Sequence, residues 1–300
     1  MANIFDDIQL DIVAKHKEIN APNATIGTVK RQRGWFRRYV DKGLYVLGWY
    51  TRFVDAGLIR GWFDEFEEYW NKVLSGRPLR FHDFHFLRGV YRQRYQDVEV
   101  ETGAHRDNFL YAWQEPRNVY SIFGAVYKYG LNPWHYYPLR KYFSRGDKVL
   151  EYGAGIAPIV TGLINDGLDH FDFTIADIQQ FTYHYAKFRL KQFGVTCIDI
   201  DPAILPPLPH DDYNIIFCMT VLEHVQNPKE IVDHLTTHLK PGGYFVFDFF
   251  LSDGTKLDTQ EAVDQRTSVL DYIKHHYDVI EGELSYTKTM MRTVVRKKNA

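Results

Sequence analysis

Hydrophobic and polar positions follow a regular plan in the second half of the chain, where short apolar runs alternate with stretches of helical period. The runs predict strands at KVLEY, FDFTIADI, VTCIDI, YNIIFCMTV and YFVFDFF, and two last strands at YDVIEG and MMRTVVRK. Helices are predicted at IAPIVTGLINDG, at Phe181–Phe193, at EHVQNPKEIVDHLTTHLK and at Val263–His276. Because strands alternate with helices, we expect an α/β fold whose mostly parallel sheet is covered on both faces.

The first half has helical period and no strand pattern. The segment WFDEFEEYWNKVL predicts a helix with one apolar face, made by Trp62, Phe66, Tyr69, Trp70 and Val73. The segment WFRRYVDKGLYVLGWYTRFV predicts another, made by Phe36, Val40, Leu44, Leu47, Tyr50 and Val54. We therefore expect residues 1–145 to form an aromatic-rich, mainly helical N-terminal part, packed on an α/β domain at residues 146–300.

Composition excludes several classes of protein. Of the 300 residues, 45% are apolar and 25% charged, which is typical of globular chains and not of disordered ones. No run of about 18 apolar residues could cross a membrane, and the first residues lack the pattern of a secretory signal. The two cysteines, Cys197 and Cys218, lie in apolar runs, so we expect inert thiols and a cytoplasmic protein.

Charge is divided unevenly along the chain. Residues 1–145 carry 22 Lys and Arg against 16 Asp and Glu, whereas residues 146–300 carry 14 against 22. The basic residues gather in KRQRGWFRR and FLRGVYRQR, which contain Lys30, Arg31, Arg33, Arg37, Arg38, Arg88, Arg92 and Arg94. Four interpretations stay open: a solvated face, a pocket for a small anionic molecule, an interfacial helix at residues 35–54, and RNA binding. RNA is the least favoured, since no RNA-binding module is recognisable, and nothing indicates DNA.

A glycine-rich turn, Glu151 to Ala157, follows the first predicted strand. Glycine lets the backbone approach a ligand closely, and the next helix offers unpaired N–H groups. A dinucleotide fingerprint would have a third glycine where this chain has Pro158, which also removes one N–H. Asp177 ends the second strand, where an acid can bind ribose hydroxyls or simply begin a helix. A tight turn without a ligand remains open.

Five segments in order resemble the class I S-adenosylmethionine-dependent methyltransferases, and more narrowly the small-molecule branch with an LEHV motif. They are VLEYGAG, FTIAD, DPAILP, YNIIFCMTVLEHV and LKPGG, within residues 146–300. The resemblance implies a Rossmann-like sheet of seven strands, the last antiparallel between the fifth and sixth. Two departures are Ala157, where many members have a third glycine, and a longer stretch between Glu151 and Asp177.

The resemblance also implies roles for individual residues. Glu151 would face the methionine ammonium, Asp177 the ribose hydroxyls and Asp201 the adenine amino group. S-adenosylmethionine has no phosphate, so the N–H lost at Pro158 costs nothing. The remaining implied cofactor contacts are Tyr152, Gly153, Ala154, Gly155, Ile178, Pro202, Met219 and Thr220.

The candidates for catalysis follow from the acceptor. An amine acceptor needs only its lone pair, whereas a hydroxyl acceptor gains from a base such as histidine. His224 follows the fourth strand, and Asp248 interrupts an apolar strand, so both are candidates. His135 and Tyr136, with Trp134 and Tyr137, could form an aromatic acceptor wall, or could simply pack. His82 and His85 lack further ligands, so no metal site is predicted.

These observations predict an enzyme that transfers a methyl group from S-adenosylmethionine to an oxygen or nitrogen of a small molecule. A sugar, a secondary metabolite or another anionic metabolite are the acceptors considered. The alternatives are an RNA or protein methyltransferase that uses the basic first half, and a binding module of the same fold without catalysis.

Overall fold

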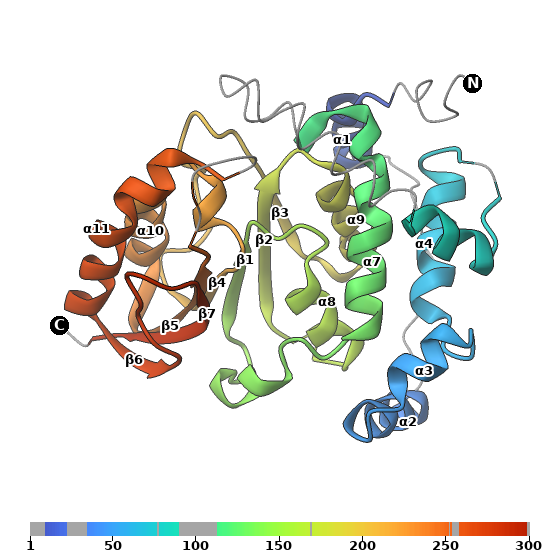
Figure 1. Cartoon of the computed structure of the whole chain (residues 1–300), viewed down its shortest axis with the longest axis horizontal. Helices are drawn as coiled ribbons and strands as arrows, with labels where there is room; N and C mark the ends of the chain where they lie inside the picture. Colours follow the sequence, from blue (N-terminus) through green and yellow to red (C-terminus); the bar gives the residue numbers. More distant parts are fainter. Residues whose placement is uncertain are drawn as a thin grey trace.

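A seven-stranded sheet forms the centre of the protein (Figure 1). The computed structural model describes residues 10–22, 35–76, 78–89, 113–168, 170–251, 253 and 258–298. The strand order is β3-β2-β1-β4-β5-β7-β6, with β1 to β5 parallel and β7 antiparallel to both of its neighbours. This confirms the predicted sheet and its inserted last strand. The strands are β1 (Lys148–Tyr152), β2 (Asp172–Ile178), β3 (Thr196–Ile200), β4 (Tyr213–Cys218), β5 (Leu239–Phe249), β6 (Tyr277–Glu281) and β7 (Met290–Lys297).

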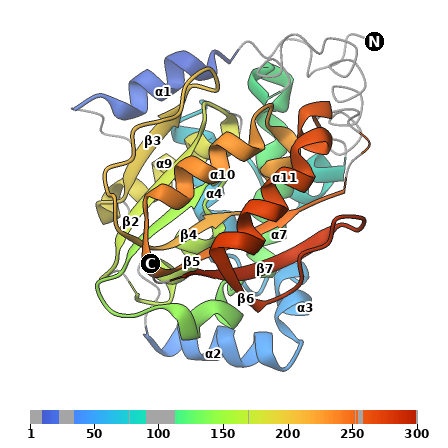
Figure 2. The ribbon, with the colours of Figure 1, turned by 90° about the vertical axis from the view of Figure 1, so that its left-hand side faces the viewer.

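Helices cover both faces of this sheet. Helices α7, α8 and α9 lie on one face, with α4 outside α7, and α10 and α11 lie on the other (Figures 1 and 2). The helices are α1 (Ile12–Asn20), α2 (Trp35–Val46), α3 (Tyr50–Asp55), α4 (Gly61–Lys72), α7 (Ser121–Leu131), α8 (Pro158–Asn165), α9 (Phe181–Leu190), α10 (Pro228–Thr237) and α11 (Gln260–His276). Residues 81–89 are helical too, and short 3₁₀ turns are η1 (Pro116–Tyr120), η2 (Tyr137–Tyr142), η3 (Lys191–Phe193) and η4 (Leu222–His224). Within the described ranges, no helix is long and apolar enough to cross a membrane.

The strands divide their side chains between two cores. Val149 and Ile215 belong to the core under α7, α8 and α9, whereas the adjacent Leu150 and Ile216 belong to the core under α10 and α11. Successive residues of a strand point to opposite faces, so an uninterrupted apolar run is what a sheet buried on both sides requires. This explains why the strands were visible as apolar runs.

Aromatic side chains join the N-terminal helices to the sheet domain. The ring of Phe66 on α4 lies 4.9 Å from Phe123 on α7 and 5.9 Å from Tyr185 on α9, both edge-on. The Tyr69 hydroxyl lies 2.6 Å from Nδ1 of the buried His184 on α9. Edge-on aromatic pairs stabilise a fold by more than the burial of their surface area alone. The packing of this interface therefore explains why the chain contains so many aromatic residues. It also confirms the prediction that the first half packs on the sheet.

The predicted helix over residues 35–54 is in fact two helices. The chain turns at Gly48, whose φ of 73° favours glycine, and α3 then begins at Tyr50. Tyr50 and Val54 are buried, but Phe36, Val40 and Leu47 are exposed, so the six residues do not form the one continuous face that the period predicts. The turn changes the direction of the helix, and only the second part faces the core.

Two boundaries after β4 also differ from the prediction. The LEHV segment is not the start of a long helix; it forms η4, and α10 begins only at Pro228, in the first helical position. The strand β5 begins at Leu239, before the proline and glycines predicted to separate helix from strand. A register shift between Tyr213 and Ile215 of β4 absorbs these extra residues. Strand β4 itself ends at Cys218, which leaves Met219 and Thr220 in a loop.

Arg266 of α11 fixes the last part of the sheet. Its guanidinium is buried and donates hydrogen bonds of 2.7–3.2 Å to the carbonyl oxygens of Phe249, Phe250, Ser285 and Lys288. It therefore connects the end of β5 to the segment between β6 and β7. A planar group with several donors suits this task better than an ammonium.

We predict that Arg266→Met lowers the free energy of unfolding by about 3 kcal/mol, because four carbonyl oxygens lose their donor. Urea unfolding at neutral pH measures the change. The control is Arg296→Met, which removes a hydrogen bond from an exposed side chain to the Gly242 oxygen; it should cost less than about 0.5 kcal/mol. Equal losses in the two variants would contradict this role of Arg266.

Candidate ligand pocket at the carboxyl edge of the sheet

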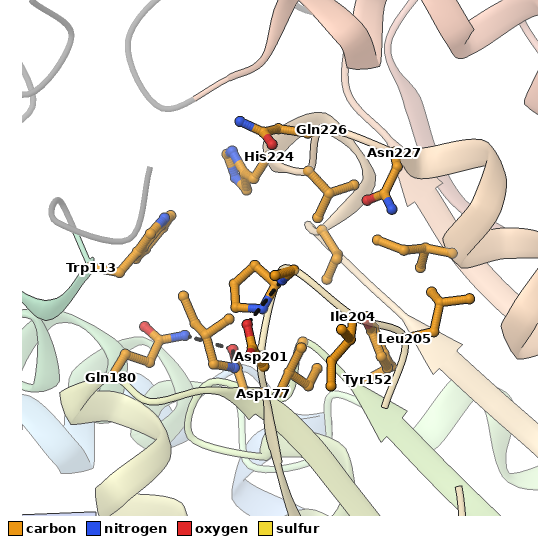
Figure 3. A pocket seen from close by; sticks show the side chains of 18 of the residues that line it. Trp113, Tyr152, Asp177, Gln180, Asp201, Ile204, Leu205, His224, Gln226 and Asn227 are labelled. Atoms are coloured by element: carbon orange, nitrogen blue, oxygen red, sulfur yellow. Dashed lines mark hydrogen bonds between the residues drawn. The ribbon is translucent and has the colours of Figure 1, made fainter. Parts of the chain in front are cut away.

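A pocket of about 360 Å³ opens where β1 to β4 end, beside the border between β1 and β4 at which the strand order reverses (Figure 3). Parallel sheets bind ligands at this edge, in the crevice formed where the strand order reverses. Residues from the turns after all four strands line it, together with Trp113 from outside the sheet domain. Its size is that of a small-molecule site.

Asp177 stands at the end of β2 and lies in the pocket wall. Its carboxylate accepts hydrogen bonds from the backbone N–H of Gly155 at 2.6 Å, the N–H of Ile178 at 2.7 Å and the side chain of Gln180 at 3.0 Å. Burial raises the pKa of Asp177 to about 6, although these three donors act to lower it. A carboxylate held in this way keeps a fixed direction toward the pocket.

Asp201 follows β3, the strand that pairs with β2, and lines the same pocket. Its carboxylate accepts a 3.0 Å hydrogen bond from the Ala203 N–H, as in a turn that begins with Asp-Pro. The surrounding side chains are apolar: Ile178, Pro202, Ile204 and Leu205 also line the pocket. The pocket thus combines two acids with apolar surface, which suits a flat ring with polar edges.

The glycine-rich turn approaches the pocket from β1. Tyr152 and Gly153 line it, and a Cβ added at Gly153 would lie 2.1 Å from Cγ2 of Val221. Gly153 also has φ of 66°, so both geometry and space require glycine there. Ala154 and Gly155 lie behind the surface of the pocket, where the Gly155 N–H holds Asp177.

Glu151 lies deeper than the sequence suggested. Its carboxylate accepts the N–H groups of Ile159 at 3.2 Å and Val160 at 2.9 Å, and so caps the N-terminus of α8 from β1. Burial raises the pKa of Glu151 to about 8, while the two N–H groups act in the opposite direction. It does not line the pocket, because the turn residues that follow it stand between.

The loop after β4 forms a further wall. Thr220 lines the pocket with an unusual φ of 58°, and its N–H donates a 2.5 Å hydrogen bond to the carboxylate of Asp248. Asp248 is buried in β5, and burial raises its pKa to about 6. Met219 and Asp248 do not line the pocket. Asp248 supports the wall from behind through its hydrogen bond with the Thr220 N–H.

His224 lies at the mouth of the pocket, beside Trp113 (Figure 3). Its Nδ1 lies 2.9 Å from Oδ1 of Asp258, and its ring meets that of Trp113 edge-on at 5.8 Å. Its Nε2 lies 3.8 Å from the carboxylate of Glu223, beyond hydrogen-bond distance. A carboxylate on Nδ1 holds the ring in the tautomer whose Nε2 can accept a proton.

Two other predicted catalytic residues are not part of this pocket. The ring of Tyr136 is buried against Gly162 of α8, and His135 lies edge-on to Tyr129 of α7 at 5.6 Å. Their segment continues through η2 to the start of β1, which lies at the amino edge of the sheet. Tyr136 therefore lies toward that edge and away from the pocket. The prediction of an acceptor wall from His135 and Tyr136 therefore does not match the structure.

Several residues of the pocket carry no signal in the sequence. Trp113 lies 38 residues before the glycine turn. Asp258, the partner of His224, lies 34 residues after that histidine, and neither residue belongs to a motif. Gln180, Gln226 and Asn227 stand just outside recognised segments. Polar residues in loops are common, so only the fold distinguishes these.

The charge of the wall is one-sided. Its lining contains the carboxylates of Asp177 and Asp201, and within the described part of the chain it contains no lysine or arginine. Such a pocket favours a cationic ligand and disfavours a pyrophosphate.

Residues 135–288 match the family described as a methyltransferase domain. A ubiquinone biosynthesis O-methyltransferase of Rickettsia canadensis is 29% identical over 96 residues, which are 32% of this chain and 39% of that protein. A malonyl-[acyl-carrier protein] O-methyltransferase of Ilyobacter polytropus is 34% identical over 64 residues, 21% of this chain and 24% of that protein. The chain thus matches about two fifths or less of the length of these curated relatives.

Among solved structures, 1,6-didemethyltoxoflavin-N1-methyltransferase of Burkholderia thailandensis aligns with a TM-score of 0.41 and 15% identity, over 69% of this chain and 90% of that one. The family match covers just over half of the 300 residues and includes β1 to β6 with the whole lining of the pocket except Trp113. This chain therefore belongs to the methyltransferase-domain family of the class I S-adenosylmethionine-dependent methyltransferases.

Proposed function

We propose that the protein transfers a methyl group from S-adenosylmethionine to a hydroxyl oxygen of a small molecule. The observation that carries the proposal is the composition of the pocket wall: two carboxylates, no described lysine or arginine, and one histidine backed by a carboxylate. The curated relatives are named for O-methyl transfer, which agrees with this acceptor atom.

The residues present suit this cofactor better than a dinucleotide. When bound, S-adenosylmethionine supplies an activated methyl group on a positively charged sulfur. Asp177 is directed to accept from ribose hydroxyls, and Ile178 and Leu205 offer apolar surface to an adenine ring. A dinucleotide would bring two phosphates to a wall whose described residues include no lysine or arginine, next to a helix whose first residue, Pro158, has no N–H.

Glu151, Ala154, Gly155 and Met219 support the cofactor from behind the wall. Glu151 orders the start of α8, and Gly155 orders Asp177. Tyr152, Gly153, Pro202 and Thr220 are the further residues expected in contact, since they line the pocket with Asp177, Ile178 and Asp201. The expected contact between Glu151 and the methionine ammonium is thereby an indirect one.

His224 is the base in this proposal, and Asp258 positions it. With Nδ1–H donated to Asp258, Nε2 can take the proton of an acceptor hydroxyl at the pocket mouth. Trp113 closes one side and limits the water that reaches the site. Asp248 holds Thr220 and is a positioning residue. Because Trp113 comes from residues 1–145, we also propose that this part completes the acceptor site.

The other acceptor classes find less support. An anionic acceptor would need cations, and the described wall has none. For RNA, Arg37 and Arg88 are already engaged, with Asp41 and over the ring of Tyr127. Lys30, Arg31, Arg33, Arg92 and Arg94 lie outside the described residues.

The first test is calorimetric titration with S-adenosylmethionine, S-adenosylhomocysteine and NAD. We expect the first two to bind in the micromolar range and NAD not to bind. Asp177→Asn should weaken cofactor binding at least tenfold, because an amide cannot accept from both hydroxyls. Binding of NAD, or unchanged affinity in the variant, would contradict the proposed site.

Acid should act on the same carboxylate. The pKa of Asp177 lies at about 6, above its ordinary value, so the ionised form that accepts from the hydroxyls is lost as the pH falls through 6. We predict that the dissociation constant for S-adenosylhomocysteine rises about tenfold per unit of pH below 6 in the wild type. Asp177→Asn, which keeps Asp248 and Glu223, should be much less sensitive; equal pH profiles would assign the effect to another group.

The contact between Gly153 and Val221 gives an independent test. In Gly153→Ala the new Cβ displaces Val221 from the wall, because the two carbons cannot lie 2.1 Å apart. We predict a loss of cofactor affinity of at least about tenfold. The double variant with Val221→Ala should recover part of that loss, since it removes the clashing methyl but not the strained φ. No recovery would show that the clash is not the cause.

Catalysis by His224 is tested on catechols and phenols, with release of S-adenosylhomocysteine as the readout. We predict that His224→Gln lowers kcat about 100-fold and leaves cofactor affinity within about twofold. Asp258→Asn should lower kcat about tenfold, because it weakens the control of the tautomer. His135→Gln is the control and should retain activity. A fully active His224→Gln enzyme would remove the base from the mechanism.

A further inference from the structure

Helix α2 presents its apolar side to solvent. Val40, Val46 and Leu47 are 41%, 73% and 71% exposed, and Phe36 and Tyr39 are exposed on the same side. These positions are spaced by three, four and seven residues, and Gly43 lies between them, so they form one stripe along the helix. The opposite side faces the protein with Asp41 and Tyr45. Trp49, half exposed, extends the apolar surface beyond the helix.

A cationic cavity adjoins this stripe. It measures about 300 Å³ and is lined by Arg38, Tyr39 and Lys42 of α2, Tyr137 and Arg140 of η2, and Asp166. Lys42 pairs with Asp166 at 2.9 Å and lies 5.0 Å from the centre of the Tyr137 ring, and Arg140 lies 3.5 Å from Asp166. The lining thus holds three cations and one carboxylate, which leaves the cavity positively charged.

Gly167 leaves the space that the Arg38 side chain occupies beside the cavity. The guanidinium of Arg38 lies over Gly167, where an added Cβ would be 2.1 Å from the nearer nitrogen. Tyr39 belongs both to the cavity wall and to the exposed stripe, so the two features share a border. A phosphate in the cavity would therefore lie next to apolar groups rather than next to water alone.

We propose that α2 docks on an anionic lipid bilayer, with the phosphate of a lipid headgroup in the cavity of Arg38, Lys42 and Arg140. An apolar stripe flanked by cations is the pattern of a helix that lies in the membrane interface. The stripe would enter the boundary between headgroups and acyl chains, and the cations would gain from the negative surface potential. If this surface were only a solvated face of the protein, the outward direction of its apolar side chains would have no explanation.

A second copy of the chain is a poorer occupant of this surface. In a symmetric dimer the same patch meets itself, which would bring the cations that border the stripe close to their own copies. A lipid surface supplies the opposite charge instead. The cavity lies beside Asp166, at the end of α8 next to the start of β2, and so at the amino edge of the sheet. The bilayer would then lie away from the ligand pocket, which would open toward water.

Flotation with vesicles tests the proposal. Full-length protein is mixed with vesicles of phosphatidylcholine alone, or with about one third phosphatidylglycerol, at about 0.1 M salt. We expect flotation only with the anionic vesicles. Val46→Ser/Leu47→Ser should reduce the bound fraction at least about fivefold through lost apolar contact. Arg38→Gln/Arg140→Gln should do the same through lost charge, and it keeps the Lys42–Asp166 pair.

The matched control is Met291→Ser on β7, whose side chain is 71% exposed like that of Leu47; it should float as the wild type does. Equal melting temperatures show that each variant is folded, independently of any cofactor. The proposal is overturned if the wild type stays unbound with both vesicles, or if both double variants still float. It is also overturned if glycerol 1-phosphate binds in calorimetry while vesicles do not, or if light scattering finds a dimer that Val46→Ser/Leu47→Ser dissociates.

Discussion

The hydrogen bond from the Gly155 N–H to the Asp177 carboxylate joins the two turns on which the pocket depends. It ties the end of β2 to the glycine turn after β1, at 2.6 Å, directly beside the pocket. The same turn is fixed from below by Glu151, which accepts the first N–H groups of α8. Two buried acids thus arrange the backbone before any ligand arrives, and the cofactor needs to order little when it binds.

Buried acids also set the electrostatic character of the site. Burial raises the pKa of Glu151 to about 8, of Glu223 to about 7, and of Asp177 and Asp248 to about 6. Each carboxylate is costly to ionise without a nearby cation. A ligand that brings a sulfonium and an ammonium would lower these pKa values and gain from the same interaction. A wall of this kind favours the charged form of the cofactor over the neutral product, which helps the product to leave.

The sequence predicted the sheet well because the sheet depends on local pattern. Runs such as VL at 149–150 and IIF at 215–217 are apolar throughout, and the structure buries their alternate residues in two separate cores. The place of the last strand, antiparallel between the fifth and sixth, followed from the resemblance and is confirmed. The pocket was predicted from residues at the ends of strands, as at Gly153, Asp177, Asp201 and Thr220. His135 and Tyr136 lie outside its lining, because nearness to β1 in sequence does not tell which end of the strand a segment reaches.

Residues brought in from a distance could not be predicted in the same way. Asp258 lies 34 residues after His224, and only the path from β5 to α11 brings it within 2.9 Å of that ring. The outward face of α2 is another case: its period predicts burial, and the turn at Gly48 decides which part of the segment reaches the core. An amphipathic helix whose apolar side is exposed to solvent leaves apolar surface in contact with water, which is unfavourable. The cations beside this surface favour an anionic membrane as the proposed partner, because the membrane would cover the apolar side of α2 and attract those cations.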